Sequence, residues 1–117
     1  MDHGEEITFS IQENSWIARL AAYVLKGEKV AIVMGKKIYL HGAKEEELMT
    51  STAWLRHELM HIQQVKKEGA FLFLIKYSWE SLRKGYRNNR YEIEARDAAQ
   101  VIDFEKKFKV VSRRSDN

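Results

Sequence analysis

The stretch Leu55-Arg56-His57-Glu58-Leu59-Met60-His61-Ile62 decides how this chain folds, because it combines an apolar stripe with two histidines at helical spacing. The stripe consists of Leu48, Leu55, Leu59 and Ile62. Its period predicts a helix from about residue 45 to Lys67, which Gly69 would end. His57 and His61 are four residues apart, so their rings are expected on one face of this helix, one turn apart.

Glu58, between the two histidines, completes an HExxH pattern, and this spacing suits a metal site. Two imidazole nitrogens one turn apart can reach a single Zn²⁺ at roughly 2.0–2.1 Å. Glu58 lies about 100° round the helix from His57, where it can act as a base on a water without becoming a ligand. The alternative is an ordinary helix whose histidines are exposed or hydrogen-bonded. The position of the pattern in the middle of the helix favours the metal site.

A catalytic zinc site usually has three protein ligands and a water, so a third ligand is expected elsewhere in the chain. The chain has no cysteine, which excludes thiolate ligands and disulfides. The remaining candidates are His3, His41, Glu92 and Glu94. Glu92 is favoured because it shares a predicted helix face with small alanines, which would permit close approach to the HExxH helix. The alternative is that both glutamates are solvated at a helix start, stabilised there by the helix dipole.

The rest of the chain predicts an α+β fold with a small antiparallel sheet and a helical second half. Alternating apolar residues predict a strand over 7–12, and helical spacing predicts a helix over 17–24, capped by Asn14 or Ser15 and ended by Gly27. Residues 30–34 and 37–41 predict a hairpin. Further helices are predicted over 71–84, ending at Gly85, and over 91–107. We predict one domain spanning residues 1–117, with a frayed tail at 112–117.

Length and composition restrict the class of protein. The 117 residues suit one domain, and a hydrophobic content of 44% can fill a core. The net charge of +3 comes from 20 basic and 17 acidic residues that are mostly interspersed, so nucleic acid is not the expected partner. The first residues lack the features of a signal peptide, and the longest apolar run, 70–75, falls far short of the about 20 residues that span a bilayer. We expect a soluble cytoplasmic protein.

Two further segments each allow two interpretations. The apolar run 71–75 is expected to be a buried helix, the alternative being a membrane-leaning or partner-binding surface. A cluster of basic residues follows, with Tyr86 and Tyr91 between them; it consists of Arg83, Lys84, Arg87 and Arg90. We expect a solvated helix end there, the alternative being contact with nucleic acid or an acidic substrate.

The HExxH stretch, which continues as Ile62-Gln63-Gln64, and the later segments Tyr77, Gly85-Tyr86 and Asn89-Arg90-Tyr91-Glu92-Ile93-Glu94-Ala95 resemble the small zincins with a His-His-Glu site. These are minimal gluzincins, a thermolysin-like core reduced to one domain. The closest likeness is to short bacterial domains with an HExxH-x-Q helix and a later Glu-x-Glu-Ala helix, and it covers roughly residues 30–104. The chain departs from thermolysin-like enzymes at Arg96, where these often have an Asp that orients a zinc-bound His. The nearest acid is Asp97.

The resemblance implies a zinc metallopeptidase that hydrolyses peptide bonds of a peptide or protein substrate. His57, His61 and Glu92 would hold the zinc, and Glu58 would be the general base. The candidates for steadying the developing oxyanion are Tyr86, Tyr91 and His41, while the strand at 37–41 is expected to accept an extended substrate by main-chain pairing. The alternative function is a non-catalytic zinc-binding scaffold or sensor that retains the zincin fold. A regulatory protease acting on a DNA-binding repressor and a metal-free nucleic-acid binder are further alternatives.

Overall fold

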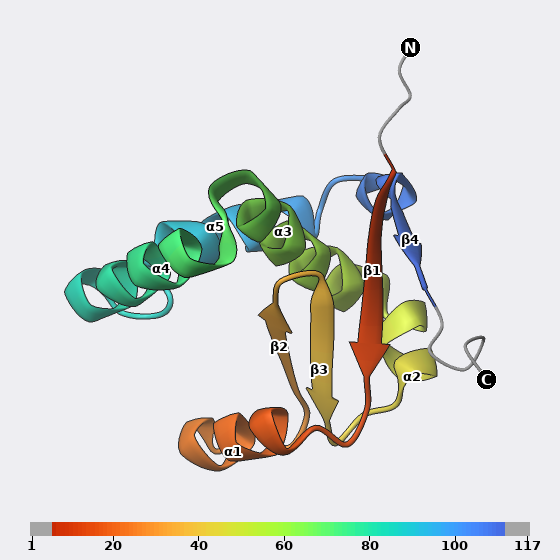
Figure 1. The fold of residues 1–117 in the computed structure, drawn as a ribbon, viewed down its shortest axis with the longest axis horizontal. Helices are drawn as coiled ribbons and strands as arrows, with labels where there is room; N and C mark the ends of the chain where they lie inside the picture. Colours follow the sequence, from red (N-terminus) through yellow and green to blue (C-terminus); the bar gives the residue numbers. More distant parts are fainter. Residues whose placement is uncertain (1–5, 112–117) are drawn as a thin grey trace.

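The computed structural model describes residues 6–111, in which four strands form one sheet with the order β2-β3-β1-β4. The strands are β1 (Ile7–Gln12), β2 (Val30–Met34), β3 (Lys37–His41) and β4 (Phe108–Val110). Figure 1 shows the helices around this small sheet, with α3 crossing one of its faces. The predicted α+β class is confirmed. His3 and the tail at 112–117 lie outside the described residues.

The sheet is mixed, so the antiparallel sheet predicted from the sequence is wrong. The hairpin itself is confirmed: β2 and β3 are antiparallel, with Met34 opposite Lys37 across a tight turn in which Gly35 has a φ of 65°. However, β1 runs parallel to β3 on one side and to β4 on the other. Alternation along a strand reports which face is buried, and it carries no information about the direction of the neighbouring strand.

The helix after β1 begins at its predicted cap. Ser15, rather than Asn14, caps α1 (Trp16–Leu25), because its hydroxyl oxygen accepts a hydrogen bond from the backbone N–H of Ala18 at 3.3 Å. The helix ends at Leu25 rather than at Gly27, and its C-cap, Lys26, takes the left-handed conformation with a φ of 59°. This helix leads the chain from β1 to β2, which lies at the edge of the sheet.

The single helix predicted over residues 45–67 is interrupted at Ser51. It is divided into α2 (Glu45–Thr50) and α3 (Thr52–Glu68). The hydroxyl of Ser51 donates to the carbonyl of Glu47 at 2.8 Å, and that of Thr50 donates to the carbonyl of Glu46 at 2.9 Å. Such bonds from short polar side chains compete with the helical backbone pattern, which accounts for the break.

The next helices begin close to the predicted positions, but the last one ends early. The described chain continues with α4 (Ala70–Lys84) and α5 (Arg90–Ala98). The predicted helix over 91–107 stops at Ala98; a turn, a 3₁₀ helix at Phe104–Lys107 and β4 follow. Phe108 is buried in the core beside β1, so packing of this segment against the sheet overrides its helical spacing.

The core lies between the sheet and the helices α2 and α3. It contains the whole predicted stripe of the HExxH helix, and the strands contribute Phe9, Ile11, Ile38 and Leu40 from the face turned toward it. Burial of this stripe fixes the rotation of α3 about its axis. The histidines, on another face of α3, are consequently turned toward Glu92 of α5.

The prediction that residues 71–75 form a buried helix is wrong. These residues begin α4 as a helix, but none of the residues of α4 is buried. Phe71, in this run, is 77% exposed, and Leu82, near the other end of α4, is 78% exposed. Among the described residues, no helix is long and apolar enough to cross a membrane. A buried helix and an exposed amphipathic helix share the same local sequence pattern. Here α4 is exposed because no other element of the described chain covers its apolar face.

Candidate metal centre

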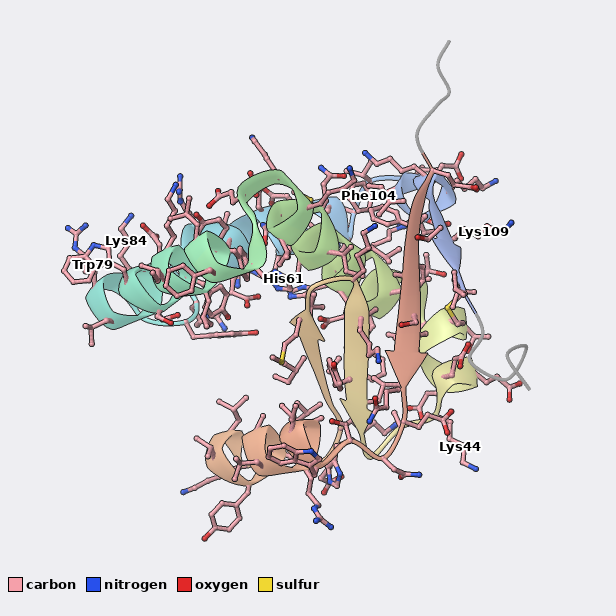
Figure 2. The ribbon with its side chains drawn as sticks, viewed as in Figure 1. Lys44, His61, Trp79, Lys84, Phe104 and Lys109 are labelled. Carbon is pink, nitrogen blue, oxygen red and sulfur yellow. The ribbon has the colours of Figure 1, made fainter. Side chains whose placement is uncertain are left out.

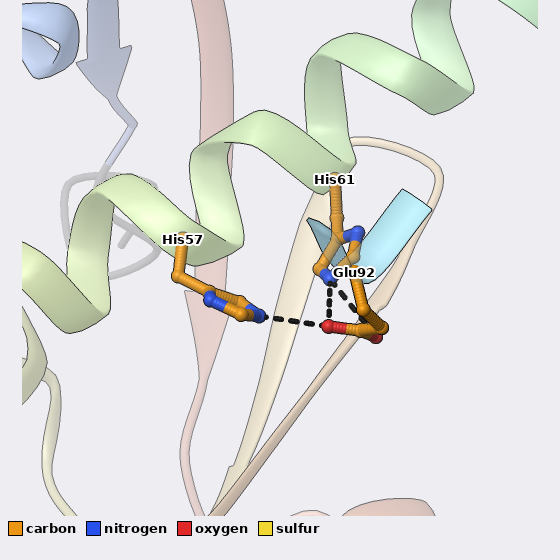
Figure 3. Close-up of side chains that lie close together, drawn as sticks. All are labelled: His57, His61 and Glu92. Atoms are coloured by element: carbon orange, nitrogen blue, oxygen red, sulfur yellow. Dashed lines mark hydrogen bonds and ion pairs between the residues drawn. The ribbon is translucent and has the colours of Figure 1, made fainter. Parts of the chain in front are cut away.

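Two histidines and one glutamate converge between α3 and α5. His57 and His61 lie one turn apart on α3, with ring centroids separated by 5.1 Å. Glu92, in the first turn of α5, lies between them: its Oε1 is 3.0 Å from Nε2 of His57 and 3.3 Å from Nε2 of His61 (Figure 3). One atom from each of the three side chains lies within 4.8 Å of the other two, a spacing that a single metal ion can bridge.

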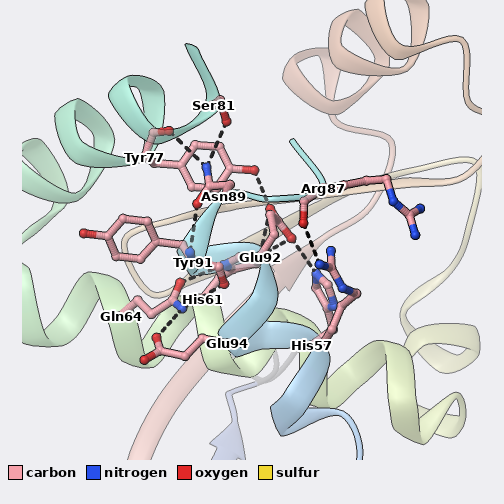
Figure 4. Close-up of polar contacts among 11 residues, drawn as sticks. His57, His61, Gln64, Tyr77, Ser81, Arg87, Asn89, Tyr91, Glu92 and Glu94 are labelled. Carbon is pink, nitrogen blue, oxygen red and sulfur yellow. Dashed lines mark hydrogen bonds and ion pairs between the residues drawn. The ribbon is translucent and has the colours of Figure 1, made fainter. Parts of the chain in front are cut away.

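The start of α5 places Glu92 in this position. Asn89 caps the helix through its Oδ1, which accepts from the backbone N–H of Tyr91 at 2.8 Å. Its Nδ2 donates to Ser81 Oγ and to the carbonyl of Tyr77, at 2.9 and 3.1 Å, and so ties α5 to α4 (Figure 4). Ala95 is fully buried on the face of α5 that carries Glu92, as the small side chains there had suggested.

His61 is oriented by Gln64, a residue to which the sequence assigned no role. The amide Nε2 of Gln64 donates to the carbonyl of Tyr91 at 3.0 Å and to Oε1 of Glu94 at 2.8 Å. Its Oε1 therefore faces Nδ1 of His61, at 2.8 Å, and can only accept (Figure 4). Nδ1 must carry the proton, so the lone pair of a neutral His61 is on Nε2, toward Glu92.

This tautomer has a consequence for the space between His61 and Glu92. A nitrogen lone pair and a carboxylate oxygen repel each other unless a cation lies between them. The cation can be a proton on Nε2 or a metal ion. Burial would lower the pKa of His61, but the hydrogen bond with Glu92 and the negative charge of Glu58 outweigh it and raise the pKa. The arrangement thus favours a positive charge at Nε2.

Glu92 is held by a third residue, Tyr77 of α4. The Tyr77 hydroxyl donates to Oε2 of Glu92, which also lies 3.3 Å from Nε2 of His61, whereas Oε1 contacts both histidines. Burial would raise the pKa of Glu92, but the hydrogen bonds from His57, His61 and Tyr77 prevail and hold it well below its usual range. Burial and the bond to Glu92 raise the pKa of Tyr77, so it stays a hydrogen-bond donor.

Glu58 lies beside the cluster without being part of it. The residue is 7% exposed, and burial raises the pKa of its carboxyl to about 7, against the opposing effect of His61 and His57. The charge of Glu92 raises it further, and the indole of Trp54 lowers it. A carboxylate next to the histidines but outside the converging set is the position expected for a base.

The other residues singled out from the sequence are divided between the site and its surroundings. Glu94 binds Gln64 rather than a histidine, and Asp97 is exposed. Tyr91 is buried, but its hydroxyl is turned to Glu68 and Arg90, away from the cluster. His41, at the end of β3, pairs with Val30 in the sheet.

Tyr86 is the oxyanion candidate whose pKa responds to the charges of the cluster. Although more than half of the residue is exposed, partial burial of the hydroxyl and the charges of Glu92 and Glu58 raise its pKa to about 12. The hydroxyl therefore stays protonated at neutral pH.

Sequence reasoning missed the roles of Gln64, Tyr77 and Asn89, which together orient the cluster. The role of Gln64 was the easiest of the three to predict from the sequence, because Gln64 follows His61 by three residues and therefore shares its helix face. The roles of Tyr77 and Asn89 depend on how α4 packs against α5, which the sequence does not show.

Comparison of the chain with protein-family models, curated proteins and solved structures finds no match.

Proposed function

We propose that this chain is a zinc-dependent metallopeptidase with a zincin-like fold, in which His57, His61 and Glu92 hold the metal and Glu58 is the general base. The observation that carries the proposal is the convergence of the three side chains, from two separate helices, within the span of one ion. The resemblance of the HExxH and Glu-x-Glu-Ala segments to the small zincins supports the same assignment.

The donor set fits zinc on chemical grounds. Two imidazole nitrogens and one carboxylate oxygen are a common combination in catalytic zinc sites, and three protein ligands leave a position for water. The tautomer of His61, fixed through Gln64, presents the Nε2 lone pair that a metal requires. Tyr77 holds the carboxylate of Glu92 through Oε2, while Oε1 is the oxygen that faces both histidines.

The chemistry supplied by a bound zinc is the activation of a water and the polarisation of the scissile carbonyl. In the proposed reaction Glu58 takes a proton from the attacking water and delivers it to the leaving amine. The hydroxyl of Tyr86, which its raised pKa keeps protonated, would donate a hydrogen bond to the carbonyl oxygen as negative charge develops there. Gln64 and Tyr77 keep the imidazole of His61 and the carboxylate of Glu92 in place.

The strand expected to pair with substrate needs correction. β3 is bonded to β2 on one side and to β1 on the other, so neither of its edges is free for an extended peptide. β2 is the edge strand on this side of the sheet, and α3 packs against it. In the proposal, an extended substrate pairs with β2, which would lead it past the α3 histidines.

The experiment that tests the proposal measures bound zinc in the wild type, Glu92→Ala, Glu94→Ala and Glu58→Gln. We expect Glu92→Ala to lose zinc, while Glu94→Ala, its matched control on the same helix, keeps it. Glu58→Gln should keep zinc but lose cleavage of a peptide library followed by mass spectrometry. Absence of zinc in metal-replete wild type would refute the site.

The same set of variants separates the peptidase from a zinc-binding scaffold or sensor. A non-catalytic site has no use for a base, so in such a module neither the wild type nor Glu58→Gln would cleave any peptide of the library. Zinc binding by the wild type without cleavage of any peptide in the library would favour the scaffold.

A further inference from the structure

Helix α4 turns an almost wholly apolar face to solvent, and no described element covers it. The exposed side chains of this face are Phe71, Leu72, Leu74, Ile75, Trp79 and Leu82. They occupy three turns of the helix, with Ser78 as the polar exception. Figure 2 shows α4 extending from the body of the protein, with Trp79 near its far end.

The opposite face of α4 packs against the rest of the protein. The ring of Phe73 packs against those of His61 and Tyr91, Tyr77 binds Glu92, and Ser81 binds Asn89. These inward residues recur every four positions and fix the rotation of the helix. The outward face is therefore presented by the fold itself, and a change in it need not disturb the metal centre.

The outward face also contains a shallow hollow. Its volume is about 380 Å³, and it is lined by Leu74, Ile75, Ser78, Trp79 and Leu82. Contiguous apolar surface of this kind is uncommon on a monomeric soluble protein and marks a contact surface.

The positive charge of the chain is concentrated around this helix. Between Lys66 and Arg90, seven Lys or Arg stand against two Glu, whereas the rest of the chain has 13 basic and 15 acidic residues. Lys76 and Lys84 are paired with Glu68 and Glu80, at 3.6 Å in each case. Arg83 and Arg87 are exposed, so they are available to an anionic partner.

We propose that the outward face of α4 docks on an anionic phospholipid surface, with the helix lying in the plane of the interface. An apolar face with Trp, Phe and Leu beside Lys and Arg is the composition of interfacial helices. Tryptophan favours the headgroup level, and basic residues are attracted to anionic lipids. The proposal is independent of the metal centre and holds whether or not zinc binds.

The charge argues against a second copy of the chain as the occupant. A two-fold symmetric contact through α4 would bring this positive segment against itself. An anionic lipid surface instead complements the charge and accepts the apolar side chains at the same time. Nucleic acid would complement only the charge and would leave Phe71, Leu74 and Leu82 in water.

The test is co-sedimentation of the full chain with vesicles of phosphatidylcholine, with or without phosphatidylserine. We expect binding to the vesicles with phosphatidylserine, weakened by added salt. The double variant Phe71→Ser/Leu82→Ser should reduce binding about tenfold or more, since both side chains enter the lipid. The matched control Val101→Ser/Ile102→Ser removes two exposed apolar side chains from the turn that follows α5 and should bind as the wild type does.

A second pair of variants addresses the charge. Arg83→Glu/Arg87→Glu should remove the preference for phosphatidylserine, whereas Lys106→Glu/Lys109→Glu should retain it. Circular dichroism establishes that each variant is folded. The proposal is overturned if the wild type binds neither kind of vesicle, or if the α4 variants bind as well as their controls. It is also overturned if Phe71→Ser/Leu82→Ser converts a dimer to a monomer in analytical ultracentrifugation without affecting vesicle binding.

Discussion

Glu92 and Glu94, two residues apart on α5, act on opposite nitrogens of the same imidazole. Glu92 faces Nε2 of His61 directly at 3.3 Å, and Glu94 reaches Nδ1 through Gln64, with contacts of 2.8 Å on either side of the amide. The sequence offered these two glutamates as alternatives for one role. In the structure they have two different roles, because the start of α5 packs alongside the HExxH helix, where Glu92 reaches His61 directly and Glu94 reaches it through Gln64.

Replacing Gln64 by Leu should weaken zinc binding by about 10–100-fold, because Nδ1 of His61 loses the acceptor that fixes the tautomer. The affinity can be measured by competition with a chromogenic chelator. Gln63→Leu is the matched control, since Gln63 adjoins Gln64 on α3 but among the described residues it is Gln64 that hydrogen-bonds to His61. If both variants bind zinc as the wild type does, Gln64 does not position His61.

Tyr77→Phe should lower zinc affinity about tenfold while leaving the ring contacts of Tyr77 with Phe73 and Tyr91 in place. The zinc affinity falls because Oε2 of Glu92 would no longer accept a hydrogen bond from the tyrosine hydroxyl. Tyr23→Phe, at a residue 83% exposed on α1, should change nothing. Isothermal titration with zinc measures both variants, and an unchanged affinity of Tyr77→Phe would contradict the role of the hydroxyl.

Asn89→Ala should destabilise the protein by about 2 kcal/mol, because it removes a helix cap and leaves its buried partners unsatisfied. Asn88→Ala, at the neighbouring exposed position, should change the free energy of unfolding by less than about 0.5 kcal/mol. Urea unfolding with a chelator present compares the two without a contribution from metal. Equal effects would mean that the cap does not hold α5.

Glu105→Gln should remove a contribution to stability that depends on pH. Nε of Arg56 lies 2.7 Å from the Glu105 carboxylate, and this hydrogen bond lowers the pKa of Glu105 in the folded state. The contribution is therefore present above the ordinary pKa of the residue, 4.5, and is lost as the pH falls through the lowered folded value. The wild type should be the more stable protein at neutral pH, and the difference should disappear in acid.

The control for this pH dependence is Asp103→Asn, which removes an ion pair to Lys106 whose two side chains are both mostly exposed. Such a pair contributes little, and asparagine tolerates the left-handed backbone at this position, where φ is 68°. Urea unfolding across the pH range compares the two variants. A difference between wild type and Glu105→Gln that persists in acid would show that Arg56 does not act through the charge of Glu105.

The sequence alone determined the local features of this protein. The period of Leu48, Leu55, Leu59 and Ile62 identified the buried face of the HExxH helix, and the spacing of His57 and His61 placed both rings on another face. The pair Asn14-Ser15, Gly69 and Gly85 marked helix ends, and the two residues between the strands at 30–34 and 37–41 marked the hairpin turn. These signals are reliable because each depends on backbone geometry over one or two turns.

Only the tertiary structure decided the direction of the strands, the early end of α5, the addition of β4 and the exposure of α4. It also decided which glutamate faces the histidines and which residues support them. Each of these outcomes depends on contacts between segments far apart in the chain, such as Phe108 beside β1 or Tyr77 against Glu92. A periodic sequence pattern indicates which face of a helix or strand is apolar. Whether another element covers that face is set by how the whole chain packs.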